Sequence, residues 1–160
     1  MLYLDYDGVL HPSEVYLIDG EPKLQLYNDQ DLTLFCWAPI LQSILDDLDP
    51  AGRVRIVLST SWVRVLGYER ALASLPEGLR QRVIGRVRIN LLNEFPRGVT
   101  VADDAAHREI EHWLAIDDDA WGWPVEHRHR LIHTSGGEGI GCSKAQDDLR
   151  KKLEYWMGRT

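Results

Sequence analysis

The first eight residues of the chain, Met1 to Gly8, place two carboxylates two positions apart directly after an apolar run. Asp5 ends the run, Asp7 follows, and Gly8 breaks the pattern. Because residues two apart in an extended chain point to the same side, Asp5 and Asp7 are expected to converge just past a buried strand. Two carboxylates this close repel each other unless positive charge lies between them. A hard, oxygen-binding cation such as Mg²⁺ is the usual solution.

Two later segments repeat the arrangement of an apolar strand that ends in a polar side chain. Val57-Leu58 runs into Ser59, and residues 114–116 run into Asp117 and Asp118. In sheets of parallel strands, ligands bind outside the carboxyl ends of the strands. The sequence therefore predicts that Asp5, Ser59 and the Asp117/Asp118 pair share one site.

Hydrophobic periodicity predicts strands that alternate with helices. The predicted strands are Met1–Leu4, Glu14–Ile18, Lys23–Tyr27, Val54–Leu58, Val87–Ile89, Leu114–Ile116 and Leu131–His133. The predicted helices are Leu32–Leu48, Val63–Ser74, a short stretch that ends by Val83, Asp103–His112 and Ser143–Trp156. This alternation is typical of an α/β fold, a Rossmann-like three-layer sandwich with a mostly parallel sheet.

The pair Asp19-Gly20 lies between two short extended runs, which is typical of a β-hairpin with a tight turn. We expect this hairpin to form a small flap over about residues 13–28. A length of 160 residues fits one domain with a substantial core, so residues 1–160 are expected to form a single domain.

The composition, with 44% hydrophobic and 27% charged residues, is that of a globular protein in water. No apolar stretch approaches the roughly 20 residues that span a membrane, and no signal peptide is expected. Cys36 and Cys142 lack metal-site spacing, so we expect free thiols in a reducing cytoplasm. The net charge of −7 argues against duplex-DNA binding but leaves a nucleic-acid end open as a substrate. The sequence predicts no oligomeric state.

The three strand-end motifs, in this order and spacing, resemble those of the haloacid-dehalogenase-like (HAD) phosphohydrolases. Asp5-x-Asp7-Gly8 resembles their first motif, the strand ending in Ser59 their second, and the strand ending in Asp117-Asp118 their fourth. The resemblance covers residues 1 to about 120. It implies a hydrolase that transfers a phosphoryl group to an aspartate and then to water.

The roles of the first two motifs follow from this chemistry. Asp5 is the expected nucleophile, which forms an aspartyl-phosphate. Asp7 is the expected general acid and base for the leaving oxygen and the attacking water. Ser59 and loop amides near Thr60 are expected to bind the phosphoryl oxygens.

The resemblance also implies a set of Mg²⁺ ligands. The ion would bind the Asp5 carboxylate, the Asp7 backbone carbonyl and Asp118, while Asp117 would orient a metal-bound water.

The third motif of the family is a Lys or Arg that neutralises the phosphoryl charge, near the start of the helix before the last acidic strand. Arg108 fits this description best, and Arg97 is the alternative. Arg64, just after the second motif, is a third candidate and could contact the substrate instead.

HAD enzymes select substrates largely through inserted cap domains, and the spacing of the motifs here leaves no room for a large cap. An open site suits a large substrate. Residues 58–62 and 113–118 look more specifically like the HAD domain of RNA-repair proteins and the phosphatase half of polynucleotide kinase–phosphatases. A nucleotide or polynucleotide end is therefore one expected substrate. Protein or small-metabolite phosphatases remain alternatives, as does a catalytically silent HAD-like binding or regulatory module.

Overall fold

The computed structural model describes residues 1–27, 31–88 and 95–158. Within these ranges, five parallel strands form one sheet in the order β5-β4-β1-β6-β7. These strands are β1 (Leu2–Leu4), β4 (Ile56–Leu58), β5 (Val83–Arg86), β6 (Leu114–Asp117) and β7 (Leu131–His133). The predicted parallel sheet is confirmed.

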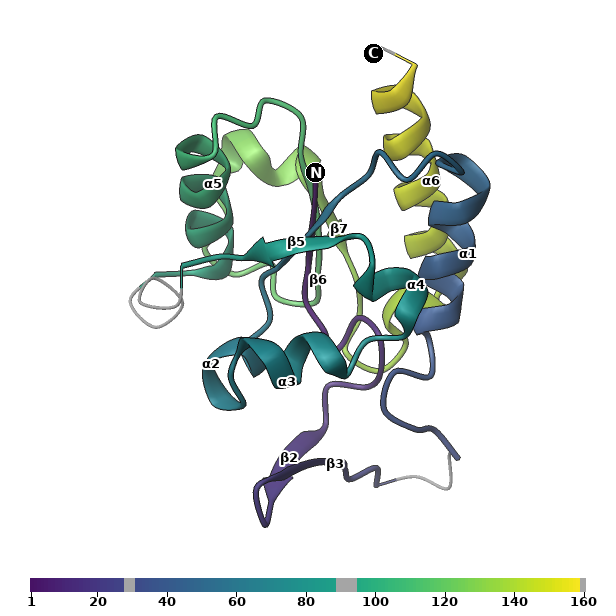
Figure 1. Ribbon diagram of the computed structural model, residues 1–160, viewed down its shortest axis with the longest axis vertical. Coiled ribbons are helices and arrows are strands. Elements are labelled where there is room, and N and C mark those ends of the chain that lie inside the picture. Colours follow the sequence, from purple (N-terminus) through teal and green to yellow (C-terminus); the bar gives the residue numbers. More distant parts are fainter. Residues whose placement is uncertain (28–30, 89–94, 159–160) are drawn as a thin grey trace.

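Helices cover both faces of this sheet. They are α1 (Ala38–Leu48), α2 (Trp62–Val65), α3 (Tyr68–Ala73), α4 (Glu77–Arg80), α5 (Arg97–His107) and α6 (Ser143–Met157), with 3₁₀ helices η2 (Val125–Arg130) and η3 (Gly139–Gly141). Figure 1 shows α5 on one side of the sheet and α1 and α6 on the other. In the parts of the chain that the structure describes, no helix combines the length and apolarity needed to cross a bilayer.

Side chains of β1 point alternately into two hydrophobic cores. Leu2 and Leu4 are fully buried in the larger core with residues of α1 and α6. Tyr3 is buried in the smaller core with Val101 and Ala105 of α5. This alternation follows from the two-residue period of a strand, and it makes the fold the predicted three-layer sandwich.

The small antiparallel hairpin consists of β2 (Val15–Ile18) and β3 (Glu21–Leu24). Asp19 and Gly20 both have positive φ angles, 54° and 79°, as a two-residue type I′ turn requires. The hairpin lies at the lower end of the molecule in Figure 1. The hairpin and its turn are confirmed, although β3 begins and ends earlier than the predicted Lys23–Tyr27 run and shares only Lys23 and Leu24 with it. Residue 28, the predicted end of the flap, lies outside the described residues.

Three predicted helices have different boundaries. Instead of Leu32–Leu48, α1 spans Ala38–Leu48, because Phe35 has a φ of 61° that no right-handed helix accommodates. The predicted Val63–Ser74 helix is divided into α2 and α3 at Gly67, whose φ is 89°. The third, α5, begins at Arg97 rather than Asp103 and ends at His107.

The predicted strand over Val87–Ile89 is displaced. The chain enters the sheet earlier, as β5, and the N–H of Val87 then donates to the carbonyl of Leu58. Ile89 lies outside the described residues.

The register of the three central strands decides where the site forms. Leu4 pairs with Leu58 on one side and with Ile116 on the other. The next residue of each strand therefore stands in one row at the carboxyl edge of the sheet, and these residues are Asp5, Ser59 and Asp117.

Candidate active site

Backbone hydrogen bonds continue the sheet just far enough to fix this row. The N–H of Ser59 donates to the carbonyl of Leu4 at 2.9 Å, and the N–H of Asp5 donates to the carbonyl of Ile116 at 3.2 Å. All three side chains of the row are almost completely buried. The structure thus brings the predicted first, second and fourth motifs together.

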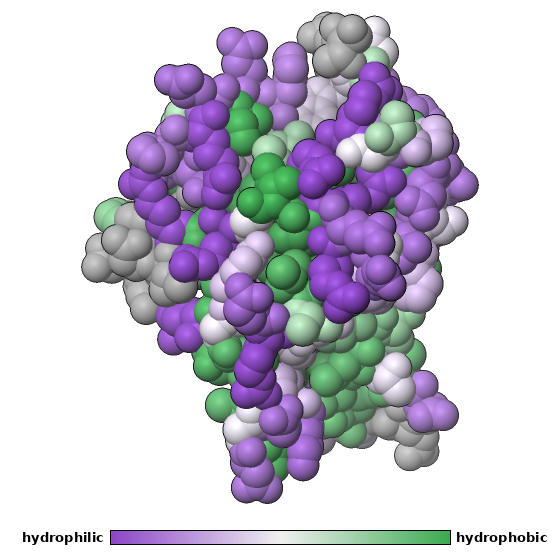
Figure 2. All heavy atoms as spheres, viewed as in Figure 1, coloured by the Kyte–Doolittle hydropathy of each residue, from purple (hydrophilic) through white to green (hydrophobic). Residues whose placement is uncertain are grey.

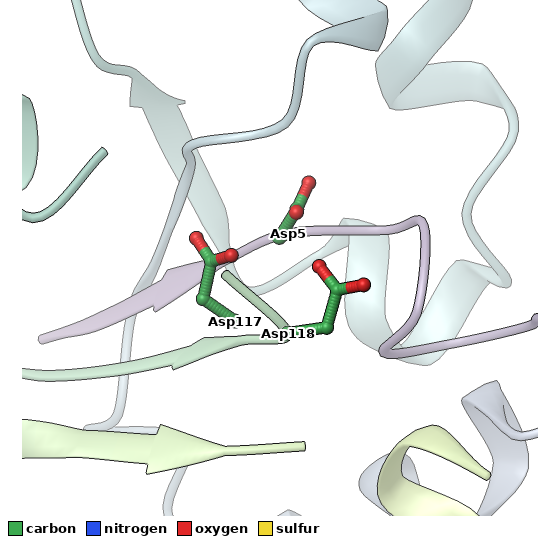
Figure 3. A group of neighbouring side chains, drawn as sticks. All are labelled: Asp5, Asp117 and Asp118. Atoms are coloured by element: carbon green, nitrogen blue, oxygen red, sulfur yellow. The ribbon is translucent and has the colours of Figure 1, made fainter. Parts of the chain in front are cut away.

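Two carboxylates of this row converge with that of the next residue, Asp118. Asp5, Asp117 and Asp118 each offer an oxygen, and these oxygens lie within 4.8 Å of one another. Figure 3 shows the carboxylates rising on the same side from the ends of β1 and β6. In the described residues this is the one such group of His, Cys, Asp or Glu side chains with metal-binding spacing.

Burial and mutual repulsion perturb all three carboxylates. Burial raises the pKa of Asp5 against the opposing attraction of Arg97. Burial and the negative charge of Asp5 raise the pKa of Asp117 well above its ordinary value. The same two causes raise the pKa of Asp118 to about 6. A bound divalent cation would remove this repulsion, and oxygen ligands of this kind are those that Mg²⁺ prefers, so the residues present fit the predicted ion.

Gly8 is required for the approach of Asp118. Its φ is 69°, and a Cβ placed on it would collide with Oδ2 of Asp118. The carbonyl of Gly8 accepts a hydrogen bond from Thr134 Oγ1 at 2.7 Å, which holds the turn in place. The glycine of the first motif therefore makes room for the acid of the fourth.

Arg97 lies at this cluster. Its Nη1 atom is 3.3 Å from Oδ1 of Asp5 and 3.6 Å from Oδ2 of Asp117, and it donates to the carbonyl of Ser59. Although burial opposes the charge of the guanidinium, Asp5 and Asp117 raise the pKa of Arg97, so it stays a cation. One cation thus contacts all three strand ends.

Arg108 does not lie at the carboxylate cluster, so the prediction that places it at the site is wrong. Its Nε donates to Asp104 at 2.6 Å, and its Nη2 donates to the carbonyl of Arg86 at 2.9 Å. Within the described residues, no ion pair joins Arg108 to Asp5, Asp117 or Asp118. The physical reason is the position of α5, which starts at Arg97 and carries Arg108 past its far end.

Ser59 and Thr60 are both buried beside the cluster. Thr60 Oγ1 accepts a hydrogen bond from the Trp62 N–H at 3.3 Å. By contrast, Ser59 Oγ and Asp117 Oδ2 have no hydrogen-bond partner in the described part of the chain. Since buried polar atoms are nearly always paired in proteins, these two atoms are suited to bind a ligand.

Asp7 is held by two donors that the sequence analysis missed. Its Oδ1 atom accepts a hydrogen bond from Trp62 Nε1 at 2.9 Å and lies 3.0 Å from Nε2 of His11. His11 is fully buried, and its Nδ1 accepts the backbone N–H of Phe35 at 3.1 Å. His11 follows Asp7 by four residues, and this short spacing is the signal in the sequence that could have indicated a contact between them.

The third cationic candidate, Arg64, and three tryptophans lie around α2 and the loop after β6. Arg64 is exposed on α2. Of the tryptophans that follow the motif loops, Trp62 and Trp123 are buried and Trp121 is exposed. Trp123 packs against Gly98, where a Cβ would meet its ring at 2.5 Å.

The family model described as "HAD domain in Swiss Army Knife RNA repair proteins" matches residues 1–145. No curated protein and no solved structure matches the chain.

Proposed function

Since the chain belongs to the family of HAD domains in Swiss Army Knife RNA repair proteins, we propose that it is a Mg²⁺-dependent phosphomonoesterase that acts on nucleotides or polynucleotide ends. The family supports HAD-like phosphatase activity at the level of the superfamily. The observation that carries the finer proposal is the row of Asp5, Ser59 and Asp117, with Arg97 in contact with all three.

Asp5 is the nucleophile of the proposed reaction. A carboxylate oxygen of Asp5 attacks phosphorus, the bond from phosphorus to the leaving oxygen breaks, and an aspartyl-phosphate forms. Water then attacks the same phosphorus, the bond to Asp5 breaks, and phosphate is released. Burial at the strand end, with Oδ1 fixed by the Tyr6 N–H at 2.8 Å, supports a single attack direction.

Asp7 supplies and removes the proton in the two steps. In the first it protonates the leaving oxygen, and in the second it takes a proton from the attacking water. Its Oδ1 faces two donors, His11 and Trp62, so Oδ2 is the oxygen left to carry the proton. The arrangement supports a carboxylate held in one rotamer throughout the reaction.

The phosphoryl oxygens need donors and positive charge as the transition state develops. Ser59 Oγ, buried and without a partner among the described residues, supplies one donor. Arg97, and not Arg108, takes the role of the third-motif cation. Backbone amides near Thr60 complete the binding of the phosphoryl group. Arg64 remains a candidate contact for parts of the substrate farther from the phosphorus.

Asp5, Asp117 and Asp118 would hold Mg²⁺, together with the backbone carbonyl of Asp7. When bound, the ion neutralises the charge that these carboxylates and the phosphoryl group bring together. Asp117 Oδ1 accepts the Asp119 N–H at 3.0 Å, so Asp117 presents to the site its Oδ2, which accepts no hydrogen bond from the described residues.

The proposal is tested by phosphate release from an aryl phosphate, with and without Mg²⁺, in the wild-type chain and in Asp5→Asn. We expect Mg²⁺-dependent release that the variant loses while its circular dichroism and melting temperature stay close to wild type. Nucleotides, phosphorylated oligonucleotides and phosphopeptides follow as substrates. Release by Asp5→Asn at the wild-type rate would refute the nucleophile. Absence of both release and Mg²⁺ binding would favour a silent binding module.

A further inference from the structure

A small hollow lies beside Asp7, between the hairpin and α2. Its volume is about 170 Å³. Val15 and Leu17 of β2 line one side, Trp62 and Val65 of α2 line the other, and Asp7 lines part of the wall. The lining does not include the three converging carboxylates, Asp5, Asp117 and Asp118. The hollow is thus a neighbour of the proposed phosphoryl site and not the site itself.

The rim of this hollow exposes apolar side chains to solvent. Leu17 is 54% exposed and Val65 is 47% exposed, although both are large and hydrophobic. In Figure 2, hydrophobic surface covers the lower right of the molecule beside the hairpin, and a narrower hydrophobic stripe runs through the mostly hydrophilic upper half. Exposed apolar residues grouped around a hollow mark ligand grooves more often than chance placement does.

The position of Asp7 decides which part of a substrate enters the hollow. A general acid must lie within hydrogen-bond distance of the oxygen that it protonates. The leaving oxygen therefore lies at Asp7, and the atoms beyond that oxygen extend from Asp7. Because Asp7 also lines the hollow, the leaving group is the part of the substrate that reaches it.

The lining restricts the chemistry of that group. Apart from Asp7, the lining residues carry no charge, and Ser61 is the remaining polar side chain among them. A second phosphate would find no cation there, and a bare sugar would find few hydrogen-bond partners. The volume is well below the roughly 300–1,000 Å³ of pockets that hold whole drug-sized molecules, so it suits a single ring or one fused ring system.

We propose that this hollow is the base subsite of the enzyme, which holds the nucleobase of the nucleotide whose phosphate is removed. The inference rests on the proposed phosphatase function and adds a substrate-recognition element to it. The flat, apolar faces of a nucleobase match walls formed by Leu17, Val65 and the indole of Trp62.

A phosphorylated tyrosine also carries a ring, but its leaving group is a phenol. A phenol is a stronger acid than a sugar hydroxyl, so a phenolate needs less protonation to leave than the alkoxide of a sugar does. Two hydrogen bonds hold the Asp7 carboxyl group in place. A general acid fixed in this way favours a leaving group that must be protonated. The geometry therefore favours a sugar hydroxyl with its base over a phosphoaryl group.

The experiment compares substrates that differ only in the base. One pair is adenosine 5′-monophosphate and ribose 5-phosphate. The other is an oligoribonucleotide with a 3′-phosphate whose last residue carries or lacks its base. For each pair, the ratio of kcat/KM with and without the base measures the contribution of the subsite. We expect the base to raise kcat/KM at least tenfold for the pair that matches the natural end.

The variants Leu17→Ser and Val65→Ser each remove one apolar wall of the hollow. Because both side chains are largely exposed, the fold is expected to persist. Each variant should lower the base-dependent ratio about tenfold, the effect of losing an apolar contact in a substrate pocket, while hydrolysis of ribose 5-phosphate stays unchanged. Val125→Ser is the matched control, because Val125 is exposed on η2 and does not line the hollow.

Several outcomes overturn the base subsite without touching the phosphatase proposal. The first is equal hydrolysis of the substrates with and without the base in both pairs. The second is a ratio of kcat/KM with and without the base that neither variant changes. The third is a preference for a phosphotyrosine peptide that Leu17→Ser abolishes. A binding readout covers the case of no turnover at all. In Asp5→Asn, adenosine 5′-monophosphate should shift the methyl resonances of Leu17 and Val65, and ribose 5-phosphate should not. Absence of that difference also overturns the subsite.

Discussion

Nε2 of His11 lies 3.0 Å from Oδ1 of Asp7, and the side chain of His11 is completely buried. The other ring nitrogen, Nδ1, accepts the Phe35 N–H, so it cannot carry a proton itself. The proton of the neutral imidazole is therefore on Nε2, which donates to Asp7. Together with Trp62 Nε1, His11 fixes the carboxylate that we propose to act as general acid and base.

Replacement of His11 by Phe should slow the step that needs the acid. We expect kcat/KM to fall about 10- to 100-fold for an alkyl phosphate, because a mobile Asp7 protonates the leaving oxygen less often. For a nitrophenyl phosphate the fall should be much smaller, because that leaving group needs little protonation. The measurement is kcat/KM across a series of leaving groups of rising pKa, which reports the first chemical step.

His11→Gln is the matched control, since its amide keeps an N–H donor at about the distance of Nε2. It should recover much of the activity toward the alkyl phosphate. A loss that is equal for all leaving groups in His11→Phe would indicate general damage to the site and would contradict the positioning role.

Arg97→Lys and Arg108→Ala distinguish the two candidates for the third-motif cation. Arg97 contacts Asp5 and Asp117, whereas Arg108 is paired with Asp104. In Arg97→Lys, the ammonium keeps the charge that the buried carboxylates need but loses the planar fork of donors, so kcat/KM should fall about 100-fold. Arg108→Ala should change kcat/KM less than about threefold, with a lower melting temperature as its main effect. The reverse ranking in steady-state kinetics would return the role to Arg108.

Asp118→Asn should weaken Mg²⁺ binding, because it removes one of three carboxylates that converge at the strand ends. Gly8→Ala should do the same without changing any charge, since its Cβ would collide with Asp118 Oδ2. Calorimetric titration with Mg²⁺ should show a dissociation constant raised at least about tenfold in each. Asp119→Asn is the control, because Asp119 is not in the cluster. Equal affinities in all four proteins would refute the assignment of the ion.

The row at the sheet edge could be predicted from the sequence because it depends on local pattern. A strand of apolar residues that ends in an acid or a serine is visible in the chain, and parallel strands bring such ends together. Asp5, Ser59 and Asp117 are therefore adjacent in the fold as expected.

Arg97 and His11 depend on contacts that local pattern does not contain. Pro96-Arg97-Gly98 reads as a loop, yet Pro96 directly precedes the first residue of α5, and Gly98 inside the helix is needed because Trp123 packs against it. The partner that fixes His11 is the backbone of Phe35, in a left-handed conformation that nothing in the sequence signals. Long-range packing sets both positions.

The carboxylate of Asp49 ties the end of α1 to the chain that enters β4. Its Oδ2 atom accepts the Val54 N–H at 2.7 Å and Arg82 Nη1 at 2.9 Å, and both side chains are buried. Although burial raises the pKa of Asp49, the hydrogen bonds from the backbone of Val54 and Arg53 and from Arg82 outweigh it, so the pKa is lowered.

Asp49→Asn should lower the free energy of unfolding at pH 7 by about 2 kcal/mol, since it removes the buried charged partner of Arg82 and leaves only the exposed carboxylate of Asp46 to pair with it. Asp47→Asn makes the same change on the same helix, but Asp47 pairs with Arg150 at the surface, so its effect should stay below about 0.5 kcal/mol. Urea unfolding of the three proteins measures both values.

The pH dependence of this difference follows from the direction of the shift. Because the pKa of Asp49 is lower in the folded state than its value of about 3.9 in the unfolded chain, its carboxylate stabilises the fold above that pH. As the pH falls below about 4, the unfolded chain binds a proton that the folded state does not, so the stabilisation declines until the folded carboxyl is protonated as well. The gap in unfolding free energy between wild type and Asp49→Asn should therefore shrink from pH 7 to pH 3. A gap that stays constant over this range would show that packing, and not the charge of Asp49, holds the end of α1 in place.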